Sequence, residues 1–100
     1  MRPIVLARLE KPRPVVVLTR EAVASRRSWV TIAPITSTVR GLGVEVPVGP
    51  RNGLDRDCIV NCDNIQTVHV DDLGEQIGYL LPDQEVLLAR AIAHAFDLPG

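Results

Sequence analysis

The chain has 100 residues and a mass of 10.9 kDa, and 46% of its residues are hydrophobic and 23% charged. That is enough apolar material for one compact core but too little length for two ordinary domains, so we expect residues 1–100 to form a single domain. No run of about 18 apolar residues predicts a membrane span, and the first ten residues are too short and too charged for a signal peptide. A cytoplasmic protein is therefore expected.

Charge is unevenly distributed along the chain, although the net charge is only −1. Residues 1–56 hold ten Lys or Arg against four Asp or Glu, whereas residues 57–100 hold one against eight. Arginine supplies nearly all of the positive charge, because Lys11 is the only lysine. Since arginine grips phosphate with paired hydrogen bonds and stacks on bases, the basic half indicates either a phosphate-bearing partner or an ordinary solvated surface.

The first half of the chain predicts four strands and one short helical turn. Pro47 places the last of these strands at a sheet edge, because proline has no backbone N–H to donate. The run that begins at Trp29 alternates large apolar residues and is expected at the centre of the sheet. The expected strands are 3–9, 13–19, 29–35 and 44–48, and the helical turn is 21–24.

The second half predicts a turn-rich loop, further short strands and one C-terminal helix. The loop spans 49–57, residues 57–61 and 64–70 form two strands or one kinked strand, 71–74 form a helical turn, and 76–80 form the last strand. Pro82 and Asp83 are typical of a helix start. This order predicts a small, strongly bent antiparallel sheet or half-open barrel closed by a helix. That helix is apolar over about three-quarters of its circumference, which favours a homodimer.

Several chemically reactive side chains are expected to be structural. If Cys58 and Cys62 share one strand, they lie about 13 Å apart, which is beyond disulfide reach and predicts reduced thiols. His69 and His94 are isolated in sequence, so a two-histidine ribonuclease mechanism is disfavoured unless the fold brings them together. We expect no metal site and no cofactor, because the nearest carboxylate group looks like turn caps: Asp55, Asp57 and Asp63.

One local pattern could bind an oxyanion or a phosphate. Arg13 opens the second strand, and the hydroxyl run Thr36-Ser37-Thr38 closes the third, followed by Arg40. A guanidinium beside hydroxyl groups would stabilise phosphate charge; the alternative is a capping arginine and turn-forming hydroxyls. We expect the two clusters to lie at opposite ends if these strands are antiparallel neighbours. They can share an end if the strands run parallel or another strand intervenes.

Six segments in this order resemble the MazF/PemK toxin family, over residues 13–98: RPVVVLTRE, VTIAPITSTVRG, EVPVG, NGLDRDCIVN, DNIQTV and DLGEQIGYL. The resemblance implies a mainly β fold with a C-terminal helix, a small SH3-like half-open β-barrel of the MazF/PemK (CcdB-like) type. It also implies the homodimeric toxin of a type II toxin–antitoxin system with a MazE-like antitoxin. The implied activity is metal-independent, sequence-specific cleavage of single-stranded RNA to 2′,3′-cyclic phosphate and 5′-OH ends, which inhibits translation.

The resemblance also assigns roles to individual residues. Arg13-Pro14 matches the family's Arg-Pro, and Thr36 in Pro34-Ile35-Thr36 matches its Pro-Ile-Thr, so these two positions are implied to be catalytic. Arg13 would stabilise the phosphorane and Thr36 would hold a non-bridging oxygen. The implied substrate-binding residues are Ser37, Thr38, Arg40, Arg20 and Gln66.

Departures from the family pattern limit what can be carried over. The loop before Arg13 is shortened to Glu10-Lys11-Pro12, and Glu10 does not match the spacing of the family's loop carboxylate, so no general base is assigned. Gln66 stands where many members have Arg, so a shared base preference does not follow, and the choice between mRNA, tRNA and rRNA stays open. A CcdB-like gyrase poison or a non-catalytic binding module is the alternative, although neither requires Arg13 and Thr36.

The antitoxin is expected to cover the RNA-binding cleft with an acidic, largely disordered tail that folds as it binds. Such a tail would mimic RNA if the arginines of the basic half share one face. The arginines expected to line that cleft are Arg13, Arg20, Arg26, Arg27 and Arg40.

Overall fold

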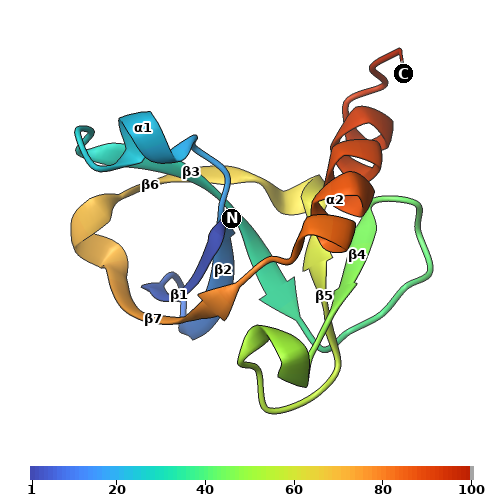
Figure 1. The fold of residues 1–100 in the computed structure, drawn as a ribbon, viewed down its shortest axis with the longest axis horizontal. Coiled ribbons are helices and arrows are strands. Elements are labelled where there is room, and N and C mark those ends of the chain that lie inside the picture. Colours follow the sequence, from blue (N-terminus) through green and yellow to red (C-terminus); the bar gives the residue numbers. More distant parts are fainter. Residues whose placement is uncertain (100) are drawn as a thin grey trace.

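The computed structural model describes residues 1–99, which form a strongly curved antiparallel sheet with one long helix beside it (Figure 1). The strands are β1 (Pro3–Arg8), β2 (Pro12–Val17), β3 (Trp29–Thr36), β4 (Glu45–Val48), β5 (Cys58–Asn61), β6 (Gln66–His69) and β7 (Leu73–Tyr79). The helices are α1 (Glu21–Ala24) and α2 (Pro82–Ala95), and the 3-10 turns are η1 (Pro50–Asn52), η2 (Cys62–Asn64) and η3 (Val70–Asp72). No helix within residues 1–99 is long and apolar enough to cross a membrane.

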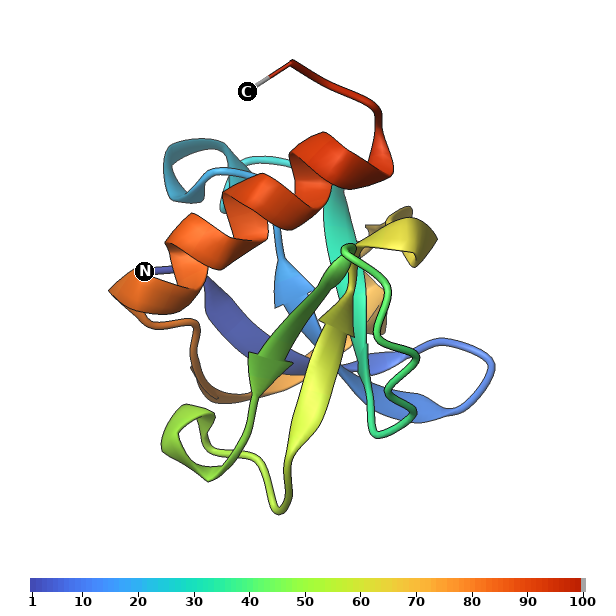
Figure 2. The ribbon, with the colours of Figure 1, turned by 90° about the vertical axis from the view of Figure 1, so that its right-hand side faces the viewer.

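The strands follow the order β4-β5-β3-β2-β1-β7, and β6 pairs with the part of β3 that β5 leaves free. The sheet curls on itself around β1, β2, β3, β6 and β7, and α2 lies across one side of the molecule (Figures 1 and 2). This confirms the predicted mainly β half-barrel with a C-terminal helix. It also confirms that the strand with Pro47 is an edge strand.

β3 contributes to two hydrophobic cores, because successive side chains of a strand point to opposite faces of the sheet. Its Val30 and Ile32 face one core, which also contains Val5, Ala7, Val15, Val17 and Val68. Its Ala33 and Ile35 face the other core, where Leu88 and Ala91 of α2 pack on the sheet. Because its side chains alternate between the two faces, β3 contributes both to the core inside the barrel and to the core beneath α2.

Several element boundaries differ from those predicted, and a side-chain hydrogen bond accompanies two of these differences. The helical turn expected at 71–74 is the shorter η3, and β7 already begins at Leu73; the backbone N–H of Asp71 donates to His69 Nδ1 at 3.1 Å and closes this turn. β2 ends at Val17, two residues early, and just beyond it Thr19 Oγ1 accepts a hydrogen bond from the N–H of Thr31 at 2.8 Å.

Both cysteines are free thiols, and they do not share one strand. Cys58 opens β5 and is half-buried, whereas Cys62 lies in η2 and is 1% exposed. Burial raises the pKa of Cys62 to about 11, with a smaller contribution from the neighbouring Asp63 carboxylate. The Cys62 thiol is therefore protonated at neutral pH and acts as a small hydrophobic core residue.

A buried pair of side-chain amides ties the loop after β4 to the rest of the molecule. Asn52 and Gln84, 1% and 2% exposed, bind each other through two hydrogen bonds of 2.6 and 3.0 Å. Their remaining donors and acceptors bind four backbone groups, the carbonyls of Pro47 (3.2 Å) and Tyr79 (2.9 Å) and the N–H groups of Gly49 (3.0 Å) and Leu81 (2.9 Å). Because buried amides are costly unless they are fully paired, this geometry fixes β4, η1, β7 and α2 together.

Replacing Gln84 by Ala is expected to lower the free energy of unfolding by about 2–3 kcal/mol, because the buried amide of Asn52 loses its partner. Urea denaturation followed by circular dichroism measures this change. The matched control is Gln76→Ala, an exposed glutamine of β7, which should stay within about 0.5 kcal/mol of the parent. Equal midpoints for the two variants would contradict a stabilising role for the amide pair.

Candidate active site

The pairing of β2 with β3 brings Arg13 and Thr36 to the same end of the sheet. The strands are antiparallel, with Val15 opposite Pro34. When this register is continued by two residues along each strand, Arg13 lies opposite Thr36. The expectation that antiparallel neighbours would hold the two clusters apart is wrong. In an antiparallel pair, the first residue of one strand lies beside the last residue of the other.

Arg13 and Thr36 line one wall of a pocket of about 380 Å³. Three cationic side chains, two hydroxyl groups and one carboxylate face it: Lys11, Arg13, Arg56, Thr36, Ser37 and Asp55. Apolar residues, including Leu54, complete its lining. Guanidinium groups beside hydroxyl donors form a site that is suited to a phosphate group.

Arg13 also lines a second pocket, of about 290 Å³, with Glu10, Asn64 and Gln66. The structure therefore brings Gln66 to Arg13, as its predicted role in substrate binding requires. It also brings Glu10 there, although its spacing from Arg13 in the sequence did not match that of the family's loop carboxylate. Arg13 is thus positioned between hydroxyl groups in one pocket and a carboxylate with two amides in the other.

The remaining predicted residues lie outside these two pockets. The backbone N–H of Thr38 donates to Thr36 Oγ1 at 3.2 Å, so Thr38 helps to orient the Thr36 hydroxyl. The backbone N–H groups of Arg40 and Gly41 each donate to the Glu45 carboxylate at 3.0 Å, which shapes the loop between β3 and β4.

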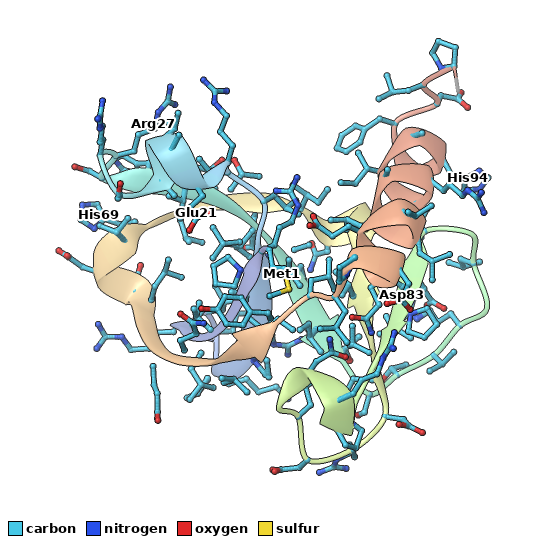
Figure 3. The ribbon with its side chains drawn as sticks, in the orientation of Figure 1. Met1, Glu21, Arg27, His69, Asp83 and His94 are labelled. Carbon is cyan, nitrogen blue, oxygen red and sulfur yellow. The ribbon has the colours of Figure 1, made fainter. Side chains whose placement is uncertain are left out.

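Arg20 lies beyond the opposite end of β2 from Arg13, in a shallow pocket with Arg2, Glu21 and Glu85. Arg27 follows α1, on the same side of the molecule as this helix (Figure 3). The expectation that one cleft collects all five arginines of the basic half is therefore wrong. The length of β2 separates Arg13 from Arg20.

Sequence reasoning missed Lys11, Asp55 and Arg56 as residues of the pocket that Arg13 and Thr36 share. Asp55 and Arg56 lie in the turn-rich loop 49–57, which the Asn52–Gln84 pair anchors. The one signal in the sequence was a charged pair inside a segment rich in turn-forming residues.

This loop also packs backbone against backbone on β7. Gly53 has a φ of +87°, and a Cβ there would lie 2.4 Å from the carbonyl oxygen of Ile77. A Cβ on Gly78 would lie 2.1 Å from the carbonyl oxygen of Asn52. Since only glycine fits at both positions, the loop that carries Arg56 sits at a fixed place against the sheet.

Other ionisable groups lie outside the two pockets that Arg13 lines. Arg51 and Asp83 form an exposed ion pair of 2.5 Å, and the Arg51 hydrogen bond lowers the pKa of Asp83. His94 is exposed on α2 and His69 lies in β6 (Figure 3). Neither histidine lines these pockets. Within residues 1–99, no group of three or more His, Cys, Asp or Glu side chains is arranged to hold a metal ion.

A curled sheet with a C-terminal helix is the fold of a class of small toxin proteins. The family model described as the PemK-like, MazF-like toxin of type II toxin–antitoxin systems matches residues 3–96. The chain belongs to this family.

Two mycobacterial relatives show how close the similarity is. The chain is 60% identical to "Endoribonuclease MazF3" of Mycobacterium tuberculosis over 98 residues, which cover 98% of this chain and 95% of the relative. It is 36% identical to "Probable endoribonuclease MazF5" of the same organism over 86 residues, which cover 85% of this chain and 79% of the relative.

Solved structures share the whole fold. The Mycobacterium tuberculosis toxin MazF-mt6 superposes with a TM-score of 0.97 at 58% identity, covering 99% of this chain and 100% of that one. An endoribonuclease in complex with its cognate antitoxin, from a mycobacterial species, superposes with a TM-score of 0.87 at 27% identity. The match covers 98% of this chain and 94% of that one.

Arg56→Ala is expected to weaken binding of a 2′-O-methylated single-stranded RNA about tenfold, because one charged phosphate contact is lost. The slope of log affinity against log salt should also fall in magnitude by about 0.7. Fluorescence anisotropy at several salt concentrations measures both quantities. Arg51→Ala is the matched control, since Arg51 belongs to the same loop but pairs with Asp83; equal losses in the two variants would remove Arg56 from the site.

Proposed function

We propose that this protein is the endoribonuclease toxin of a type II toxin–antitoxin system and cleaves single-stranded RNA at specific sequences without a metal ion. The products are a 2′,3′-cyclic phosphate and a 5′-OH end, and the loss of intact RNA inhibits translation. The observation that carries this proposal is the convergence of Arg13 and Thr36 in a pocket with two further cations. Membership in the toxin family and the names of the relatives support it.

The protein has to stabilise charge and accept a proton, because the RNA supplies its own nucleophile. The ribose 2′-OH attacks the adjacent phosphorus, and the bond to the 5′-oxygen breaks. A side chain of the protein accepts the proton lost from the 2′-OH, and a solvent water gives a proton to the leaving 5′-oxygen. Arg13 donates hydrogen bonds to the charged oxygens of the phosphorane. The Thr36 oxygen already accepts the N–H of Thr38, so its own O–H is free to donate to a non-bridging oxygen.

Glu10 is the group we assign as proton acceptor. Arginine is permanently protonated and cannot accept the 2′-OH proton. Glu10 supplies the carboxylate of the second pocket that Arg13 lines. Gln66 lines the same pocket, and its amide can both donate to and accept from a base edge.

Further substrate contacts follow the path of the chain away from Thr36. Ser37 faces the same pocket as Arg56, and these two residues bind the phosphate beside the one that is cleaved. Thr38 and Arg40 are exposed on the loop that continues from Ser37, where they meet the next phosphate.

The protein works with two protein partners in this scheme. The exposed apolar residues of the C-terminal segment are Val86, Leu87, Phe96 and Leu98, between 39% and 56% exposed. Leu87 also lines an apolar groove of about 630 Å³, together with residues of β4 and β5 such as Pro47 and Ile59. The exposed apolar side chains and this groove support a homodimer. A cognate MazE-like antitoxin, with an acidic tail, covers the cationic pocket in the cytoplasm until the toxin is released.

Arg13→Ala is expected to lower the cleavage rate by about 10²-fold or more, and Thr36→Val by a smaller factor, because each removes a contact to the phosphorane. The assay incubates a long RNA with the protein in excess EDTA and sequences the ends of the products. Cleavage by the parent should persist in EDTA. Turnover at the parent's rate by Arg13→Ala, or a strict Mg²⁺ requirement, would overturn the proposed mechanism.

Glu10→Gln is expected to lower kcat by about 10²-fold with little change in KM, because it removes the proton acceptor but keeps the shape of the side chain. Single-turnover rates separate this loss of kcat from any change in RNA binding. Glu75→Gln, at an exposed position of β7, serves as the matched control. A Glu10→Gln variant that cleaves at the parent's single-turnover rate would leave the base to another group.

A further inference from the structure

An exposed aromatic pair lies at the other end of β3 from Thr36. Trp29, the only tryptophan of the chain, is 58% exposed. Its ring meets the ring of His69 edge to face, with centroids 5.1 Å apart and planes at 86°. Leaving so large an apolar ring in water forgoes the stabilisation that its burial would give, so this position calls for a functional reason.

The backbone holds these two rings in a fixed place. Trp29 is directly opposite His69 in the β3–β6 pairing, and the N–H of Val70 donates to the carbonyl of Ser28 at 2.8 Å just beyond them. His69 Nδ1 is further tied to the N–H of Asp71. The pair is therefore a preformed surface on the sheet.

Three arginines surround this end of the strand. Arg26 and Arg27 lie in the turn that leads into Trp29, and Arg20 directly precedes α1; all three are exposed. None of them forms an ion pair within residues 1–99, where the paired arginines are Arg2, Arg8 and Arg51. Figure 3 shows Arg27 and His69 on the side of the molecule away from α2.

We infer that this Trp29 patch (Trp29, His69, Arg20, Arg26 and Arg27) is a second binding site for single-stranded RNA, which holds the strand leading away from the cleavage pocket. The inference rests on the proposed function. Unpaired arginines bind backbone phosphates, and an exposed tryptophan stacks on bases of any sequence. An acidic peptide would satisfy the arginines, but it would leave the aromatic surface unused.

The spacing along the strands sets the length of RNA that can use both sites. Trp29 and Thr36 are seven residues apart on β3, about 23 Å at ~3.3 Å per residue. That span corresponds to about seven stacked nucleotides at ~3.4 Å each. β6 makes a shorter connection, because it begins at Gln66 beside Arg13 and ends at His69.

Because Trp29 is the only tryptophan, its own fluorescence reports on the patch. Titration of the full-length protein with a 12-nucleotide 2′-O-methylated single-stranded RNA should quench this fluorescence to saturation, whereas a 5-nucleotide RNA should not. Trp29→Leu should bind the 12-nucleotide RNA about tenfold more weakly by anisotropy, and Trp29→Phe should recover most of this loss. The matched control is Tyr79→Leu, another exposed aromatic of the sheet, which should bind like the parent.

Cleavage separates this inference from the proposed function. Trp29→Leu should raise KM about tenfold for a long RNA, keep kcat, and cleave a 5-nucleotide substrate like the parent. Equal affinity of Trp29→Leu and the parent for the 12-nucleotide RNA would overturn the inference, whatever the cleavage results. The inference would also be overturned if Trp29→Leu lost antitoxin binding but kept RNA binding, because the patch would then be a protein-binding surface. A protein that binds RNA at Trp29 but cleaves none would instead overturn the proposed function alone.

Discussion

The rest of this structure depends on the pairing of β3 on both of its edges. β2 occupies one edge, while β6 and β5 share the other. The residues between Trp29 and Thr36 are therefore held from both sides, and neighbouring residues of the strand fill two different cores. Because the strand is fixed in this way, it sets the distance between the side chains at its Trp29 end and those at its Thr36 end. The protein places hydroxyl groups at one end and an aromatic ring at the other.

The cationic pocket is built at an electrostatic cost. Lys11, Arg13 and Arg56 share one small space with a single carboxylate, Asp55, and like charges at such distances repel in the absence of an anion. Rigid supports elsewhere offset this repulsion, since the amide pair and the two close glycine contacts hold the loop of Arg56 against β7. An anion that enters the pocket would reduce this repulsion.

Local rules predicted most of the fold from the sequence. Alternation of apolar residues located the strands, Pro47 identified an edge and Pro82 the start of α2, because each of these signals acts through the backbone of its own segment. The motif match identified Arg13 and Thr36, which lie 23 residues apart in the sequence, and their proximity then followed from antiparallel pairing.

Long-range contacts account for what could not be predicted. Arg56 reaches the pocket through a loop whose position depends on Gln84, which lies 28 residues further along the chain. Arg13 and Arg20 are chemically alike and close in sequence, yet a strand separates them, so counting charges could not sort them into different sites. The neighbourhood of Glu10 was also missed, because it depends on where β6 and Asn64 lie relative to the β1–β2 turn.

The anchored amide of Asn52 also affects how fast the protein is degraded by deamidation. Asn52-Gly53 is the chain's one Asn-Gly sequence, the dipeptide most prone to deamidation, in which the glycine nitrogen attacks the side-chain carbonyl carbon. In the folded chain this nitrogen donates to the carbonyl of Pro50 at 3.0 Å, and hydrogen bonds hold both ends of the Asn52 amide in place. Ring closure would break these bonds, so spontaneous damage at this position should proceed mainly through unfolded copies. The chemical lifetime of the toxin is therefore tied to its conformational stability.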